Sequence, residues 1–132
     1  MIIIADSGSS KIDWRLIRRD GSISQASCPG FNPYYQPLND LRTSLRDELM
    51  PKVDEAVAKI FFYGTGVSSE KNQHDVRGIF LEFFPGAQVD IEWDLLAAAR
   101  ALCGTEPGIA CILGTGSNSC YYDGVKIAGQ VA

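Results

Sequence analysis

The same succession of strands and turns occurs twice in this sequence, and no other feature limits its possible folds as strongly. Residues 2–23 comprise an apolar run, a Gly/Ser turn, a strand of alternating character, an Asp-Gly turn and a third strand. Residues 110–127 show the same order, again with a glycine turn first and an Asp-Gly turn second. An Asp-Gly pair between alternating apolar residues is typical of a tight hairpin turn. The two copies are therefore predicted to superpose as similar hairpins, with glycine turns at matching positions.

The segment between the two copies predicts an α/β protein. Its apolar periodicity alternates between strands, expected at 59–63 and 88–92, and helices, expected at 38–50 (continuing after a kink over 51–58), 70–84 and 95–102. If the repeat is structural, residues 1–107 form an N-terminal lobe and residues 108–132 begin a second, truncated lobe. Chance recurrence of a common hairpin pattern is the alternative.

Composition narrows the classes of partner. The 132 residues include 12 Lys+Arg and 16 Asp+Glu, which gives a net charge of −4, whereas proteins that bind nucleic acid usually show a basic surplus. No apolar run approaches the roughly 18 residues of a membrane span, and the N-terminus lacks the basic leader of a signal peptide. The four cysteines form no C-x-x-C pair and are expected to be small hydrophobes. We therefore expect a cytoplasmic protein with neither nucleic acid nor membrane as a partner.

Three glycine turns follow apolar strands, at 6–11, 64–69 and 114–118. The backbone N–H groups of such turns can converge on a phosphate group, and Ser or Thr hydroxyls add further donors. The P-loop motif G-x-x-x-x-G-K-[ST] is absent from the sequence. The dinucleotide fingerprint needs a third glycine and a following helix, and neither G-T-G turn has that third glycine. The turns are thus predicted to be phosphate loops of a strand–turn–strand type.

These residues resemble one family. The motif DSGSSK at 6–11, followed by Trp14, resembles the first phosphate motif of the N-acetylglucosamine kinases and of their relatives, the activator ATPases of benzoyl-CoA reductase and 2-hydroxyglutaryl-CoA dehydratase. LGTGSN at 113–118 resembles the second phosphate motif, Asp94 matches the catalytic aspartate, and GFNP at 30–33 resembles the sugar-contacting loop. The resemblance implies a ribonuclease H-like (actin-like ATPase) fold, with a mixed sheet and flanking helices.

The resemblance also implies a role for each residue. Asp6 would hold Mg²⁺, usually through water, and Asp94 would bind the sugar and accept the proton of its attacking hydroxyl. The phosphates of ATP would be held by both glycine turns: Gly8, Ser9, Ser10 and Lys11 from one side, and Gly114, Thr115, Gly116 and Ser117 from the other. The sugar would contact a second set of residues: Asn32, Gly64, Thr65 and Gly66. The expected reaction is ATP-dependent phosphoryl transfer to an amino sugar, N-acetylglucosamine being the first candidate.

Alternatives stay open at this point. The family's adenosine motif and most of its second lobe have no counterpart in these residues. An activator ATPase would hold an iron–sulfur cluster by paired cysteines, which this sequence lacks. A non-catalytic binding module would keep the fold without turnover, and Asp94 is also a good N-cap for the helix that follows it. A homodimer is the candidate assembly.

Overall fold

The first sheet is built around β1 (Ile2–Ser7). This strand pairs antiparallel with β2 (Lys11–Ile17) on one side and parallel with β4 (Lys59–Gly64) on the other. β3 (Ile23–Pro29) extends the antiparallel side and β5 (Gln88–Trp93) the parallel side, so the strand order is β3-β2-β1-β4-β5. The parallel pairing requires a crossover, which the helices between β3 and β4 supply.

A second, smaller sheet lies near the C-terminus. The structure, a computed structural model, describes residues 1–113 and 117–131. β6 (Gly108–Leu113), β7 (Ser117–Tyr122) and β8 (Ile127–Val131) pair antiparallel in that order. The predicted repeat is confirmed in its order of elements, because β1–β2–β3 and β6–β7–β8 are both antiparallel meanders.

The Asp-Gly turns of the two meanders agree in detail. Gly21 has φ +86° and Gly124 has φ +101°, a region that favours glycine. In each turn the aspartate Oδ1 accepts the backbone N–H two residues further on, at 2.8 Å for Asp20 and 2.9 Å for Asp123. The glycine motif at 114–116 is followed by the strand β7 and not by a helix, so it is not the phosphate loop of a dinucleotide-binding fold.

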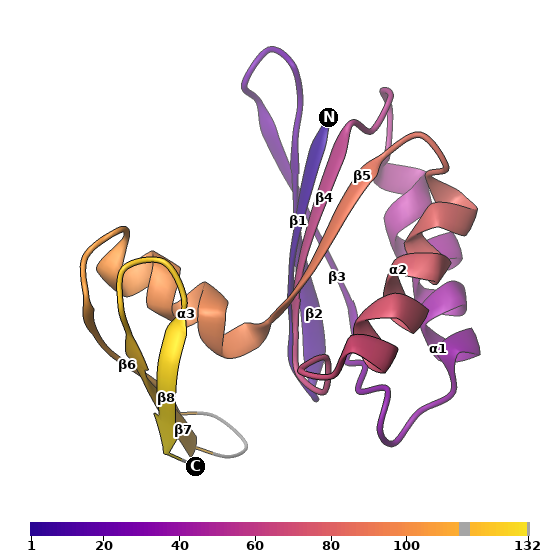
Figure 1. Cartoon of the computed structure of the whole chain (residues 1–132). Coiled ribbons are helices and arrows are strands. Elements are labelled where there is room, and N and C mark those ends of the chain that lie inside the picture. The colour runs from indigo at the N-terminus through magenta and orange to yellow at the C-terminus, as the bar shows by residue number, and fades with distance from the viewer. Residues whose placement is uncertain (114–116, 132) are drawn as a thin grey trace.

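Two helices cover one face of the first sheet, and α3 (Asp94–Cys103) lies on its other side (Figure 1). α1 (Leu38–Ser44) runs on through a π-helical turn, Leu45–Leu49. α2 (Glu70–Phe83) begins at Ser69, whose side chain accepts the N–H of Asn72 as an N-cap.

The core between this face and the helices is aromatic at its centre. Trp14 of β2 is fully buried, and its ring centroid lies 6.4 Å from that of Phe62 and 6.0 Å from that of Phe80. Phe62 and Phe80 are 5.3 Å apart. Ile12 and Leu16 lie on the same face as Trp14 and are equally buried, as the alternation in β2 predicts.

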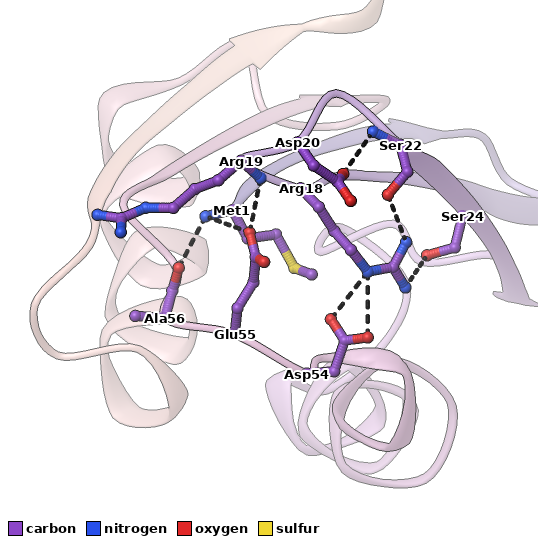
Figure 2. A network of polar contacts seen from close by, with 9 residues as sticks. All are labelled: Met1, Arg18, Arg19, Asp20, Ser22, Ser24, Asp54, Glu55 and Ala56. Atoms are coloured by element: carbon purple, nitrogen blue, oxygen red, sulfur yellow. Dashed lines mark hydrogen bonds and ion pairs between the residues drawn. The ribbon is translucent and has the colours of Figure 1, made fainter.

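The predicted helix over 51–58 is wrong. A 3₁₀ turn, Met50–Lys52, ends the helical segment, and Val53 is extended, with φ −84° and ψ 113°. The reason is long-range: the side chain of Arg18, at the end of the β2–β3 hairpin, donates from Nε to both oxygens of Asp54 at 3.0 and 3.1 Å. These bonds hold residue 54 against the hairpin (Figure 2).

The N-terminus reinforces this anchor. The ammonium group of Met1 donates to the carbonyl oxygen of Ala56 at 2.8 Å and lies 3.3 Å from Glu55 Oε1. The same Glu55 oxygen accepts the backbone N–H of Arg19 at 2.9 Å (Figure 2). The segment after the 3₁₀ turn thus joins β1, the β2–β3 hairpin and the start of β4.

The second sheet has its own apolar cluster. The inward residues of α3 are Leu95, Leu96 and Ala99, and they pack with Ala110, Cys120 and Tyr122 of β6 and β7. The apolar cluster of the first sheet includes no described residue after Ile91, so the two clusters share no residue. Among the described residues, no helix is both long and apolar enough to cross a lipid bilayer.

Candidate functional site

Asp6 stands near the end of the central strand β1, at the end of the sheet where the glycine turns at 6–11 and 64–69 lie. In register it sits between Asp13 of β2 and Tyr63 of β4. Partial burial raises the pKa of the Asp6 carboxyl, the charge of Asp13 raises it further, and Lys11 lowers it. The side chain still reaches solvent, so it can meet a ligand.

The first glycine turn is a tight hairpin tip. Gly8 donates its backbone N–H to the carbonyl oxygen of Lys11 at 2.9 Å, which leaves Ser9 and Ser10 exposed at the end of the loop. Lys11 Nζ lies 3.2 Å from Asp13 Oδ2, and the lysine side chain is 66% exposed. Hydroxyl groups and an ammonium group therefore project from the loop that was predicted to bind phosphate.

Backbone hydrogen bonds join this turn to two other loops. Gly30 donates its N–H to the carbonyl oxygen of Ser10 at 3.2 Å, and Thr65 donates to that of Ser7 at 2.9 Å. A Cβ at position 30 would lie 2.3 Å from the carbonyl oxygen of Ser9, so only glycine allows this approach. The structure thus brings the predicted phosphate loop and the predicted sugar loops to one end of the sheet.

Asn32 and Gly66 are in direct contact. Gly66 has φ +75°, and a Cβ on it would lie 2.3 Å from Asn32 Oδ1. That oxygen accepts the backbone N–H of Tyr34 at 3.0 Å, while the carbonyl oxygen of Gly66 accepts the Asn72 side-chain amide at 2.9 Å. The turn at 64–66 is therefore fixed from both sides, with Asn32 on one and α2 on the other.

Asp94 is the first residue of α3, and its predicted role as N-cap is wrong. Trp93 holds the N-cap position with extended backbone, φ −69° and ψ 140°, and no side-chain capping bond is made. Burial raises the pKa of the Asp94 carboxyl most strongly, the N–H of Leu95 lowers it, and the negative charge of Asp6 raises it again. The carboxylate is half-buried and lies within electrostatic range of Asp6, as a shared site requires.

The remaining predicted phosphate residues are described only in part. Gly114, Thr115 and Gly116 lie outside the described residues, and Ser117 is the first residue of β7. Among the described residues, no group of three or more His, Cys, Asp and Glu side chains could hold a metal ion. A single exposed carboxylate such as Asp6 fits Mg²⁺ nonetheless, because Mg²⁺ keeps several waters and is held by one or two carboxylates together with substrate phosphates.

Three neighbours of the site were missed by sequence reasoning. Asp13 is opposite Asp6, and counting residues back from the hairpin tip at 9–10 would have found it. Tyr63 and Arg100 meet through a hydrogen bond, from Arg100 Nη1 to Tyr63 Oη at 3.1 Å. No local pattern signals that pair, because it joins β4 to a helix on the other side of the sheet.

A solved protein shares this arrangement over the whole chain. It comes from Porphyromonas gingivalis, is provisionally named an N-acetylglucosamine kinase, and superposes with a TM-score of 0.91. The two sequences are 38% identical, and the match covers 100% of this chain and 48% of that protein. The chain therefore spans about half the length of that protein.

More distant structures share the fold alone. A Sinorhizobium meliloti protein provisionally named a 2-dehydro-3-deoxygalactonokinase gives a TM-score of 0.56 at 13% identity, covering 99% of this chain and 52% of that one. YeaZ from Pseudomonas aeruginosa gives 0.50 at 19% identity, covering 98% of this chain and 65% of that one. The sequence matches no protein-family model and no curated protein.

Proposed function

Because this chain is N-acetylglucosamine kinase-like and has the fold of the actin-like ATPases and sugar kinases, we propose that it supplies the acceptor site of an ATP-dependent amino-sugar kinase. The acceptor we propose is N-acetylglucosamine. The observation that carries the proposal is the contact among three loops, at 8–11, 30–33 and 64–66, at one end of the first sheet. Beside them, the charge of Asp6 acts on Asp94.

The first glycine turn would hold the outer phosphates of ATP. Ser9 and Ser10 offer hydroxyl donors at its tip, and the Lys11 ammonium lies beside them. The second turn, comprising Gly114, Thr115, Gly116 and Ser117, would hold the phosphates from the other lobe. Phosphoryl transfer depends mostly on positioning and charge stabilisation, so fixed donors on two sides are the main requirement.

Asp6 would hold Mg²⁺ through coordinated water. Mg²⁺ supplies neutralisation of the charge on the β- and γ-phosphates when it is bound. The Asp6 side chain reaches solvent at the end of β1, next to the phosphate loop, which suits a carboxylate that binds hydrated metal. Asp13, opposite it, is already engaged by Lys11.

The sugar would lie against Asn32 and the turn that contains Gly64, Thr65 and Gly66. The Asn32 side-chain oxygen is engaged by the backbone of Tyr34, so the amide hydrogens are the groups it would offer to a sugar oxygen. The close approach at Gly66 fixes the Asn32 side chain in this orientation.

Asp94 would act as the general base. As the bond between the γ-phosphorus and the bridging oxygen of ADP breaks, a sugar hydroxyl oxygen bonds to that phosphorus and its proton passes to the Asp94 carboxylate. The raised pKa of Asp94 makes the carboxylate a better proton acceptor than an ordinary aspartate. The reaction leaves ADP, a sugar phosphate and a protonated Asp94, which loses its proton to solvent.

The test is sugar-dependent turnover by the complete protein. We expect ADP release with Mg²⁺ and ATP to require N-acetylglucosamine, and mass spectrometry to identify one sugar phosphate. N-Acetylmannosamine, glucosamine and glucose serve as competing acceptors and define the substrate. ATP hydrolysis at the same rate without any sugar would overturn the kinase assignment and favour an activator ATPase. Sugar binding without nucleotide binding would favour a non-catalytic module.

A further inference from the structure

The helix that carries Asp94 packs mainly away from the sheet that carries Asp6. Its buried side chains, Leu95, Leu96 and Ala99, belong to the apolar cluster of the second sheet. No residue of α3 belongs to the cluster of the first sheet, although α3 contacts β1, β4 and β5. The apolar contacts of α3 therefore fix Asp94 relative to the second sheet. Asp6, its proposed partner in the site, lies on the first sheet.

One polar contact joins α3 to the first sheet near the site. Arg100 Nη1 donates to Tyr63 Oη at 3.1 Å, and the register places Tyr63 between Asp6 of β1 and Glu92 of β5. Partial burial lowers the pKa of the Arg100 guanidinium, but the hydrogen bond with Tyr63 and the charge of Glu92 outweigh it and the pKa is raised. The guanidinium is thus held at the same end of the sheet as Asp6.

We propose that Arg100 and Tyr63 form a clamp that positions Asp94 opposite Asp6, an inference that rests on the proposed function for its catalytic consequence. Arg100 follows Asp94 by six residues on α3, about 9 Å along the helix axis at 1.5 Å per residue. A contact at that distance fixes the direction of the helix, and with it the place of its first residue. The proposed function assigns neither Arg100 nor Tyr63 a contact with a reacting atom, so both would be positioning residues.

The clamp itself is tested without any activity measurement, by amide hydrogen exchange in this chain. Tyr63→Phe removes the acceptor oxygen and keeps the ring, and Tyr121→Phe makes the same deletion on the half-exposed tyrosine of β7. We expect α3 amides to exchange about five- to tenfold faster in Tyr63→Phe, since a hydrogen bond to a charged group is lost. Tyr121→Phe should leave α3 unchanged. Exchange in α3 that is the same in Tyr63→Phe and wild type would overturn the clamp.

The catalytic consequence is tested in the complete protein. We expect Tyr63→Phe to lower kcat about tenfold with the KM for ATP within twofold, because the nucleotide loops are untouched. Arg100→Met should do the same, and the double variant should be no worse than either single variant, as for two halves of one contact. Arg100→Lys, which keeps a donor, should recover part of the rate.

The outcomes separate the two proposals. Faster exchange in α3 with unchanged kcat would overturn the positioning role of the clamp. Unchanged kcat in Asp94→Asn would overturn the proposed function, while the exchange result would still decide whether the clamp exists. If Tyr63→Phe fails to fold, Arg100→Met probes the same bond from an exposed residue and replaces it in both measurements.

Discussion

The negative charge of Asp6 raises the pKa of Asp94, although one residue belongs to the central strand β1 and the other begins α3. Burial is the larger cause, and the like charge adds to it. Two carboxylates that repel each other at one end of a sheet do not stabilise the fold. Their placement therefore points to a site whose chemistry needs them, as groups with perturbed pKa values at loop ends often do.

The first prediction concerns stability against pH. The pKa of Asp94 in the folded chain lies above its ordinary 3.8, so the folded state binds this proton more tightly than the unfolded state. The free energy of unfolding should therefore fall as pH rises from about 3.8 through the raised pKa. Asp94→Asn removes this loss and should gain stability relative to wild type between pH 3 and pH 7 in urea titrations.

Asp123→Asn provides a control of opposite sign. Hydrogen bonds from the backbone N–H groups of Lys126 and Val125 lower the pKa of Asp123, so its charge stabilises the fold above pH 3.8. That contribution is lost as pH falls through the lowered pKa. Asp123→Asn should therefore lose stability relative to wild type at pH 7 and approach it at low pH. The same direction for both variants would contradict the environments described above.

The second prediction concerns turnover. Asp94→Asn in the complete protein should lower kcat with N-acetylglucosamine and ATP about 10²–10⁴-fold, because an amide cannot accept the proton. The melting temperature should not fall, because the raised pKa means that the charge of Asp94 does not stabilise the fold, and the Asn side-chain oxygen can still accept the Leu95 N–H. Glu70→Gln, at the first residue of α2, is the matched control and should leave both quantities unchanged. Turnover by Asp94→Asn within a few-fold of wild type would refute the general-base role.

The third prediction concerns the contact between Gly66 and Asn32. Gly66→Ala places a methyl group 2.3 Å from Asn32 Oδ1 in a backbone of φ +75°. The left-handed conformation alone costs about 1–2 kcal/mol, and the clash displaces Asn32. We expect lower stability together with weaker sugar binding, measured by calorimetric titration with N-acetylglucosamine.

Gly78→Ala is the control for that variant. Gly78 lies within α2, and a Cβ there meets nothing within 4 Å. Replacing it should raise stability by about 0.5–1 kcal/mol through helix preference and leave sugar binding as it is. If Gly66→Ala behaves like Gly78→Ala, the two loops do not meet as described.

The fourth prediction compares the two Asp-Gly turns. Gly21 and Gly124 both have positive φ, but a Cβ on Gly21 meets nothing within 4 Å, whereas one on Gly124 would lie 2.5 Å from the carbonyl oxygen of Thr105. Gly21→Ala should lower the free energy of unfolding by about 1–2 kcal/mol through backbone strain. Gly124→Ala should lower it more, because the clash adds to that strain. Denaturant titration of the two variants gives the comparison, and equal losses would show that the second turn does not pack against residue 105.

Local patterns were sufficient for much of the first sheet. The alternation of Ile12, Trp14 and Leu16 predicted which face of β2 is buried, and the Asp-Gly turns predicted both meanders. The association of the glycine turns with Asn32 came from resemblance, since backbone bonds between distant loops leave no periodic signal. The assignment of Gly64, Thr65 and Gly66 to the same end of the sheet has the same origin.

Long-range contacts account for what the sequence did not predict. Helical spacing continues past Met50, but Arg18 and the N-terminal ammonium bind residues 54–56 and keep them extended. Asp94 was predicted to be an N-cap because Asp is common at that position. The helix instead begins at Asp94 itself, and Trp93 takes the N-cap position. The Arg100–Tyr63 bond depends on where α3 lies, which no segment of the chain encodes by itself.

The central place of β1 sets the order in which the chain can fold during synthesis. β1, β2 and β3 are consecutive, so their hairpins can close once residues 2–29 have emerged, whereas β4 and α2 come later in the chain. Trp14 of that meander would lack its neighbour Phe80 until α2 is made. A meander formed before α2 would leave the apolar face around Trp14 open to solvent, and exposed apolar surface of this kind favours aggregation.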